Sequence, residues 1–266
     1  MNRKKALIAI SFGSTFDETR IRDIGGIEQA LTDAFPAYDH YRAFTSVIVR
    51  KRLAERGINV DDTETVLQKL KEAGYEEIIL QPTHLLHGEE FEQKIMALKS
   101  KYETLFKKFL ISKPLIVNDE DFQLVAAAIS AQFPVLGEDE GVVLMGHGTP
   151  RNNNQAHGYT YVKLQGIFKS MNLPVIIGTV EDEDTPNFDT VLHELKIRKY
   201  KHVHMYPLMV VAGDHANNDM YGEDDDSWKT QIEAIGVRTT GHLCGLGRIK
   251  AVQALYIQHV LHTLSL

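Results

Sequence analysis

The stretch Val66-Leu67-Gln68-Lys69-Leu70-Lys71 recurs 125 positions later as Val191-Leu192-His193-Glu194-Leu195-Lys196. The match runs without gaps from residues 66–90 to residues 191–215, where seven of 25 positions are identical. Self-similarity at a fixed offset is the signature of a repeated structural unit. The sequence therefore predicts that the chain contains two copies of one helix–strand–loop arrangement.

Apolar runs typical of buried strands alternate with helical patterns in both halves of the chain, and a second offset of 135 positions places Ile8–Gly13 on Val143–Gly148. Strands alternating with helices indicate a parallel sheet covered on both faces. We expect an α/β protein of two similar lobes facing each other across a cleft, one over residues 1–125 and one over 126–266. The predicted strands are Ala6–Ile10, Tyr38–Phe44, Glu77–Pro82, Leu110–Val117, Gly141–Met145, Val175–Val180 and His202–Pro207.

The repeat also indicates where chemistry is located. Segments that leave the carboxyl ends of parallel strands are where open α/β sheets bind ligands. In the alignment of the two copies, Glu90 falls on His215 after one strand, and Phe12 falls on His147 after another. The two copies thus have different residues after corresponding strands. Imidazole and carboxylate are common metal ligands. His147, Glu90 and His215 are therefore the candidate metal-binding residues.

Neighbouring residues leave alternatives open. His84 and His87 precede Glu90, and His87 has the i,i+3 spacing at which two side chains can share a ligand. His202 and His204 lie on one face of a predicted strand, where a half-buried strand face is a simpler explanation than a metal site. The acidic runs Asp182–Asp184 and Glu223–Asp226 are typical of solvated loops.

Composition excludes several classes of protein. Of the 266 residues, 43% are hydrophobic and 24% charged, as in ordinary globular chains. The net charge of −7 argues against general nucleic-acid binding. With the single cysteine Cys244, a thiolate zinc site is excluded. No apolar run approaches the roughly 18 residues of a membrane span, and the first one ends at Ser11. We therefore expect a cytoplasmic protein without membrane contact.

Several motifs resemble those of one family, the anaerobic cobalt chelatases that act on sirohydrochlorin in cobalamin synthesis. The resemblance covers essentially the whole chain, and the Gly-Asp-His-Ala and Gly-His-Gly blocks together make it specific. The motifs are Ser11-Phe12-Gly13, Arg42-Ala43-Phe44-Thr45-Ser46, His84 to Glu90, Met145-Gly146-His147-Gly148, Pro207 to Met220, Asp226-Ser227-Trp228-Lys229 and Cys244-Gly245-Leu246-Gly247.

The resemblance implies two flavodoxin-like lobes and ATP-independent insertion of Co²⁺ into sirohydrochlorin or precorrin-2. It implies that His147 is the catalytic histidine and that Glu90 and His215 bind the metal ion. Alternatives are a ferrochelatase acting on sirohydrochlorin or protoporphyrin, and a non-catalytic metal or haem carrier. Fe²⁺ and Ni²⁺ are possible metals in place of Co²⁺. We expect the ion to be a substrate, with no permanently bound cofactor, and the chain to form a possible homo-oligomer.

A tetrapyrrole needs apolar walls and donors for its peripheral carboxylates. Residues near the predicted strand ends supply both, and no nucleotide-binding glycine motif is present. The expected walls are Phe12, Phe44, Leu85, Leu86, Met209 and Val210, and the expected donors are Ser11, Ser14, Arg42, Thr45 and Ser46.

Overall fold

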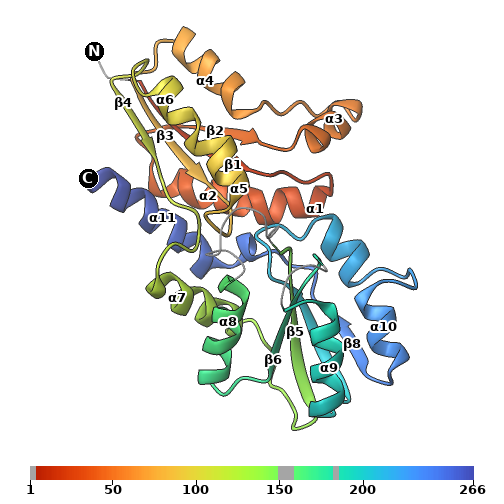
Figure 1. The fold of residues 1–266 in the computed structure, drawn as a ribbon. Helices are drawn as coiled ribbons and strands as arrows, with labels where there is room; N and C mark the ends of the chain where they lie inside the picture. The colour runs from red at the N-terminus through yellow and green to blue at the C-terminus, as the bar shows by residue number, and fades with distance from the viewer. Residues whose placement is uncertain (1–3, 149–158, 182–185) are drawn as a thin grey trace. The chain divides into compact units, whose positions relative to one another are not determined.

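The computed structural model describes residues 4–148, 159–181 and 186–266. Over these residues the chain forms two four-stranded parallel sheets flanked by helices (Figure 1). The strands are β1 (Lys5–Ser11), β2 (Asp39–Phe44), β3 (Glu77–Pro82), β4 (Lys108–Ile111), β5 (Glu140–Gly146), β6 (Val175–Thr179), β7 (His202–Pro207) and β8 (Arg238–Gly241).

The helices are of three kinds. The α-helices are α1 (Asp17–Thr19), α2 (Gly25–Ala34), α3 (Val47–Glu55), α4 (Thr63–Glu72), α5 (Glu89–Phe91), α6 (Leu98–Tyr102), α7 (Asp119–Ser130), α8 (Tyr159–Ser170), α9 (Phe188–Arg198), α10 (Trp228–Ala234) and α11 (Lys250–Ser265). The π-helices are η1 (Arg20–Ile24), η2 (Glu92–Met96) and η3 (Ala216–Met220), and η4 (Leu246–Arg248) is a 3₁₀-helix.

The structure confirms the predicted repeat. Strands β3 and β7 have identical bounds after the 125-residue shift, and β1 and β5 coincide after the 135-residue shift. Helices α4 and α9 are both capped by a short polar side chain at the equivalent positions Asp62 and Asn187, each accepting a hydrogen bond from the third backbone N–H of its helix. The sheet orders β2-β1-β3-β4 and β6-β5-β7-β8 correspond strand for strand.

Contacts divide the chain into two compact units. The first unit comprises Met1–Val117 with Lys250–Leu266, and the second comprises Asn118–Ile249. The helix that follows the last strand of each copy therefore packs in the other unit: α7 follows β4 but belongs to the second unit, and α11 follows β8 but belongs to the first. This division differs from the expected boundary between residues 125 and 126, because sequence similarity locates the copies and not the helices exchanged between them.

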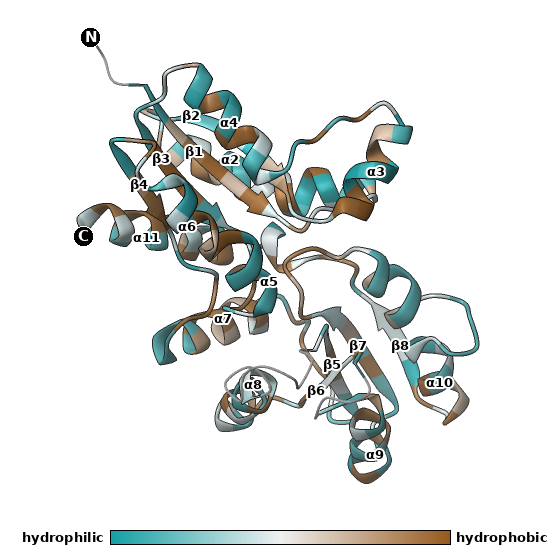
Figure 2. Cartoon of the chain, turned by 45° about the horizontal axis from the view of Figure 1, so that its top comes forward, coloured by the Kyte–Doolittle hydropathy of each residue, from teal (hydrophilic) through white to brown (hydrophobic). Residues whose placement is uncertain are grey.

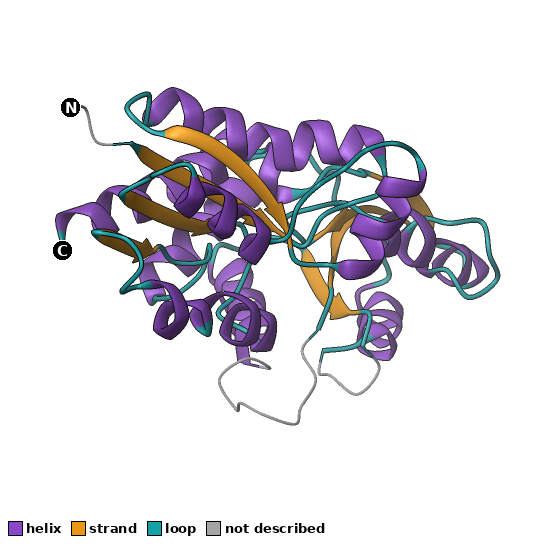
Figure 3. Cartoon of the chain, turned by 90° about the horizontal axis from the view of Figure 1, so that it is seen from above, coloured by secondary structure: helices purple, strands orange, loops and turns teal. Residues whose placement is uncertain are grey.

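In the first unit, alternate residues of β1 serve opposite faces of the sheet, as the two-residue period of a strand requires. Ala6, Ile8 and Ile10 share one core with helices α4 and α6, while α2 and α11 pack side by side elsewhere in the unit. Helices therefore cover the strands on both sides (Figure 3). The hydropathy colouring shows β1 as a largely hydrophobic strand and α4 with mixed character (Figure 2), as burial on both faces of the sheet predicts.

In the second unit, Val143 and Met145 of β5 belong to a core that also holds Val191 of α9 and Trp228 of α10. Each fully buried aliphatic side chain of this kind contributes about 1.5–3 kcal/mol relative to exposure. The stabilisation from burying one such side chain exceeds the few tenths of a kcal/mol by which most residues differ in helix propensity. Tertiary packing thus stabilises these elements more than local preference does.

One predicted strand has different bounds in the structure, and one strand was not predicted. The run Leu110–Val117 forms a strand only as Lys108–Ile111 (β4), because Pro114 lacks the N–H that a continued ladder needs. After it, a single bridge joins Ile116 to Leu86. The edge strand β8 was not predicted, since Arg238-Thr239-Thr240-Gly241 has no apolar run. Within the described residues, no helix combines the length and apolar character that a membrane crossing requires.

Candidate metal centre

Glu90 follows β3 in the first unit, on the short helix α5 whose next residue, Phe91, is buried in the core. Its carboxylate accepts a hydrogen bond from the Thr45 hydroxyl, and Oε1 lies 3.6 Å from Nε2 of His84. Burial raises the pKa of the Glu90 carboxyl, but the contacts with His84 and Thr45 outweigh it and the net shift is downward. Glu90 is therefore held as a carboxylate, which is the form that binds a cation.

His84, which the sequence left as an alternative candidate, lies beside Glu90. Its side chain is only 11% exposed, and neither ring nitrogen has a hydrogen-bond partner among the described residues. A buried polar group without a partner costs stability unless a ligand or proton completes it. His84 is consequently a candidate to assist Glu90.

His87 is not a partner of Glu90. Its ring is hydrogen-bonded to Glu92 and lies against the edge of Phe91, with ring centroids 4.4 Å apart. Glu89 is exposed and accepts a hydrogen bond from Gln93 at 2.6 Å. Of the two adjacent glutamates, Glu90 is thus the one whose carboxylate contacts Thr45 and His84 at the carboxyl end of the sheet.

His147 directly follows β5 in the second unit, between two glycines with different roles. A Cβ on Gly146 would lie 2.2 Å from the Tyr161 ring, and Gly148 has a φ of +98°, which residues with side chains rarely adopt. The Gly148 N–H donates to the Tyr161 hydroxyl at 3.2 Å. Helix α8 therefore fixes the turn that presents the half-exposed His147 ring. In the first unit the equivalent Gly13 has a φ of +102°.

His147 and His215 are brought together by the fold. Their ring centroids lie 4.8 Å apart with the rings nearly perpendicular. His215 Nδ1 lies 2.6 Å from Asp219 Oδ2, one helical turn away on η3. An ionised carboxylate can only accept, so His215 donates from Nδ1 and its Nε2 is the nitrogen left for a metal ion. His147 Nδ1 faces the Gly148 carbonyl at 3.3 Å and the Glu181 carboxylate at 3.9 Å.

The residues expected to bind the tetrapyrrole fall into two groups. Those with accessible surface are Phe12, which is 53% exposed, and the half-buried Thr45, Leu85, Leu86 and Met209. Others are buried or already engaged: Phe44 is fully buried, Val210 is nearly so, Ser11 bonds Thr83, Ser14 bonds the Phe16 N–H, and Ser46 caps α3. The Phe44 ring packs beside Gly13 and thereby supports the turn at that glycine. The expectation that Phe44 is an apolar wall does not match this burial.

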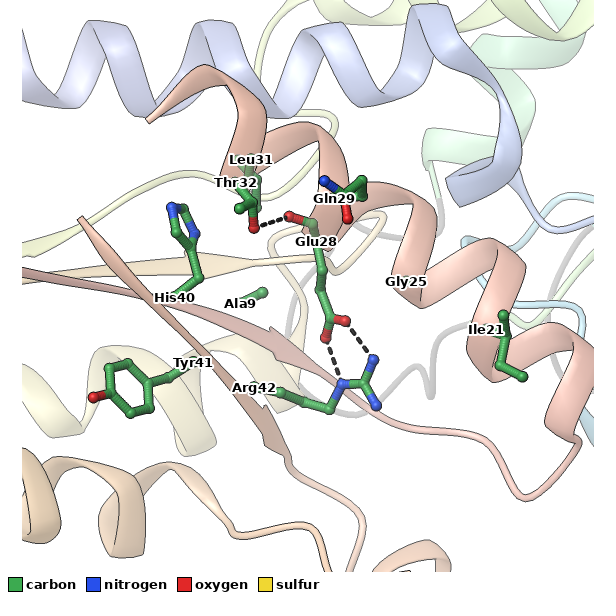
Figure 4. Close-up of a pocket in the computed structure, with 10 residues that line it drawn as sticks. All are labelled: Ala9, Ile21, Gly25, Glu28, Gln29, Leu31, Thr32, His40, Tyr41 and Arg42. Atoms are coloured by element: carbon green, nitrogen blue, oxygen red, sulfur yellow. Dashed lines mark hydrogen bonds and ion pairs between the residues drawn. The ribbon is translucent and has the colours of Figure 1, made fainter. Parts of the chain in front are cut away.

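Arg42 lines a separate hollow of about 430 Å³ between α2 and β2. Its guanidinium points at the Glu28 carboxylate (Figure 4), with Nε donating at 2.7 Å. This hydrogen-bonded pairing raises the pKa of Arg42. Because Glu28 neutralises it, Arg42 offers no free charge to a peripheral carboxylate, which the sequence alone did not reveal.

Sequence reasoning missed four residues that support or extend these groups. Asp219 orients His215, and the i,i+4 spacing was the available signal. Tyr161 holds the Gly148 turn, a contact that no local pattern indicates. Val47 and Ile48 are each 65% exposed where α3 begins after β2, so they add apolar surface at the sheet end that carries Phe12.

The acidic run Asp182–Asp184 lies outside the described residues.

The fold is similar to that of solved chelatases. SirB from Bacillus subtilis with Fe³⁺ matches with a TM-score of 0.62 at 17% identity, covering 98% of this chain and 95% of that one. CbiX, described as the terminal enzyme for siroheme biosynthesis in denitrifying bacteria, matches with a TM-score of 0.55 at 14% identity, covering 97% and 99%. These likenesses define the fold as that of the chelatases.

Sequence comparison identifies the family. A sirohydrochlorin cobaltochelatase from Salmonella typhimurium is 35% identical over 264 residues, which is 99% of this chain and 97% of the relative. The sirohydrochlorin cobaltochelatase CbiKC of Nitratidesulfovibrio vulgaris is 30% identical over 266 residues, covering 98% and 91%. The family model described as "Cobalt chelatase (CbiK)" matches residues 5–265. The chain belongs to the cobalt chelatase family, as the motifs predicted.

Proposed function

We propose that this chain inserts Co²⁺ into a sirohydrochlorin-type tetrapyrrole in cobalamin synthesis, without nucleotide hydrolysis. Membership of the cobalt chelatase family supports the reaction. The observation that carries the chemistry is the pair of adjacent imidazoles, His147 and His215, of which one is oriented by Asp219. The expected cytoplasmic location stays a prediction.

The reaction exchanges two inner N–H protons of the macrocycle for one divalent ion. We assign the role of Co²⁺ ligand to His215 Nε2 in the second unit and to the Glu90 carboxylate in the first, because imidazole and carboxylate suit a divalent ion of this kind. Few and mixed ligands bind the ion weakly enough to release it to the four pyrrole nitrogens. Glu90 remains ionised because His84 and Thr45 favour its charged form.

We assign the first proton transfer to His147. A neutral imidazole can accept a proton from a pyrrole nitrogen, and it becomes cationic as the N–H bond breaks. Glu181, 3.9 Å from His147 Nδ1, stabilises that cation. The second proton leaves to solvent or to the same base after it has released the first. Exposed Phe12, Val47 and Ile48 provide apolar surface for the macrocycle.

The decisive experiment is a multiple-turnover assay with sirohydrochlorin or precorrin-2 and Co²⁺, Ni²⁺ or Fe²⁺, followed by ultraviolet–visible absorption. A cobaltochelatase gives linear product formation beyond one equivalent with Co²⁺. A ferrochelatase turns over Fe²⁺ in preference to Co²⁺, with sirohydrochlorin or protoporphyrin as acceptor. A carrier stops at one equivalent with every metal.

A further inference from the structure

A second cluster of imidazoles lies on one face of the sheet in the second unit. His202 and His204 project from the same face of β7, two residues apart. The register pairs Glu140 of β5 with His202, and His242 directly follows β8 on the other side. Three neighbouring strands thus bring one carboxylate and three imidazoles onto one patch.

The donor atoms are within metal-binding range of one another. One ligand atom from each of Glu140, His202 and His204 lies within 4.8 Å of the other two. His204 Nδ1 is 3.1 Å from His242 Nε2. Two nitrogens each bound at 2.0–2.1 Å in a tetrahedral site are about 3.3 Å apart, so this pair needs almost no movement to share an ion.

The charge state also suits a cation. Burial lowers the pKa of His204 and of His242, and the neighbouring imidazoles lower both further. The backbone N–H of Gly137 and the His202 ring lower the pKa of the Glu140 carboxyl. His204 and His242 therefore favour the neutral form and Glu140 the ionised form, which are the forms that ligate metals.

Hydrogen bonds within the protein hold the cluster together when no ion is bound. His202 bridges Glu140 and Thr240, with both ring nitrogens at 2.8 Å from their partners, which is a sufficient tie between strands. His204 and His242 share one hydrogen bond, in which one ring nitrogen donates and the other accepts. A metal ion would take the place of the shared proton and bind both nitrogens.

This cluster is separate from the pair described above. Glu140 begins β5 and His147 follows its end, so residues 141–146 lie between them and the two residues are on the order of 20 Å apart along the strand. We propose that Glu140, His202, His204 and His242 form a second site for one divalent transition-metal ion, such as Zn²⁺, Co²⁺ or Ni²⁺, which ties β5, β7 and β8 together. The site binds an ion that is not consumed by the insertion reaction.

The test measures bound Zn²⁺ per chain by equilibrium dialysis without tetrapyrrole. The parent for the comparison is a His147→Ala/His215→Ala chain, in which the first pair of imidazoles is absent. We expect one Zn²⁺ per chain in this parent, loss of at least ten-fold in affinity on adding His204→Gln/His242→Gln, and no loss on adding the matched surface substitution His193→Gln on α9. Equal Zn²⁺ content in all three chains overturns the proposal.

Two further readouts separate a metal site from a folding defect. In the otherwise unchanged protein, His204→Gln/His242→Gln should retain the chelatase rate, because the cluster lies outside the proposed reaction site. Zn²⁺ should raise the melting temperature of the His147→Ala/His215→Ala chain, since a ligand that binds only the folded state stabilises it. If Zn²⁺ leaves that melting temperature unchanged, the proposal fails even if the glutamine variants do not fold.

Discussion

The imidazole rings of His147 and His215 meet edge to face, 4.8 Å apart at 89°, although 68 positions separate them in the chain. Only His215 has a carboxylate at hydrogen-bond distance from Nδ1. The two rings are therefore not equivalent. The oriented ring suits a metal ligand, and the more exposed ring suits a base that must gain and release a proton.

Asp219→Asn tests the orientation of His215. An asparagine side chain can offer its NH₂ to Nδ1, which favours the tautomer with its proton on Nε2 and blocks the metal-binding nitrogen. We expect Co²⁺ to be used 10–100-fold less well, the usual effect of removing such a partner. The measurement is the dependence of rate on Co²⁺ concentration. Asp214→Asn is the matched control, since Asp214 is exposed and bonds only Asn218 among the described contacts. Equal effects of the two substitutions would contradict the assignment.

His147→Ala separates the base from the ligand role. Loss of a ligand is overcome by excess Co²⁺, whereas loss of a base slows proton transfer by about 10²–10⁴-fold at every Co²⁺ concentration. We expect the rate at saturating Co²⁺ to remain depressed. Steady-state assays across Co²⁺ concentration at fixed pH decide the question, and full recovery at saturation would leave His147 as a ligand alone.

Glu90→Gln tests the carboxylate of the first unit. The amide keeps the shape of the side chain and the contact with Thr45 but removes the charge. We expect weaker use of limiting Co²⁺ with little change in melting temperature. Glu89→Gln, one residue earlier and exposed, should leave the rate unchanged. A loss of rate on Glu89→Gln alone would move the assignment by one position.

His84→Gln extends the same test to the neighbour of Glu90. Because His84 lowers the pKa of the Glu90 carboxyl, its removal should raise that pKa. The Co²⁺ concentration that gives half the maximal rate should then rise, and the rise should be larger at mildly acidic pH than at neutral pH. The check is the pH profile of the apparent Co²⁺ affinity for both chains, and parallel profiles would show that His84 does not act through Glu90.

Glu77→Gln tests a buried ion pair that holds β3 in place. Burial raises the pKa of Glu77, but the Tyr38 hydroxyl at 2.5 Å and Lys5 at 3.1 Å lower it overall. A carboxyl with a depressed folded pKa stabilises the fold above its unfolded pKa and loses that contribution as pH falls through the folded pKa. We expect the substitution to lower the free energy of unfolding by about 1–3 kcal/mol at pH 7. The difference should shrink below about pH 4, as measured by urea unfolding at several pH values.

Local sequence was sufficient where one residue type decides the backbone. Pro82 and Pro207 end their strands, and β3 and β7 have the predicted bounds. The predicted strand Gly141–Met145 ends close to where β5 ends, just before His147, and the φ of +98° at Gly148 favours glycine. Where the pattern was weak, as in β8, or interrupted by Pro114, prediction failed.

The sequence by itself determined the repeat, the parallel α/β architecture, the family, and the strand ends that carry His147, Glu90 and His215, because hydrophobic periodicity, proline and glycine act within a few residues of themselves. Only the tertiary structure decided that α11 packs with the first unit, that Glu28 engages Arg42, that Phe44 is buried, and that Asp219 and Tyr161 fix the two histidine segments. Most of these depend on contacts between segments distant in the chain. Such contacts arise from burial and charge pairing across the whole fold, to which no local pattern is sensitive.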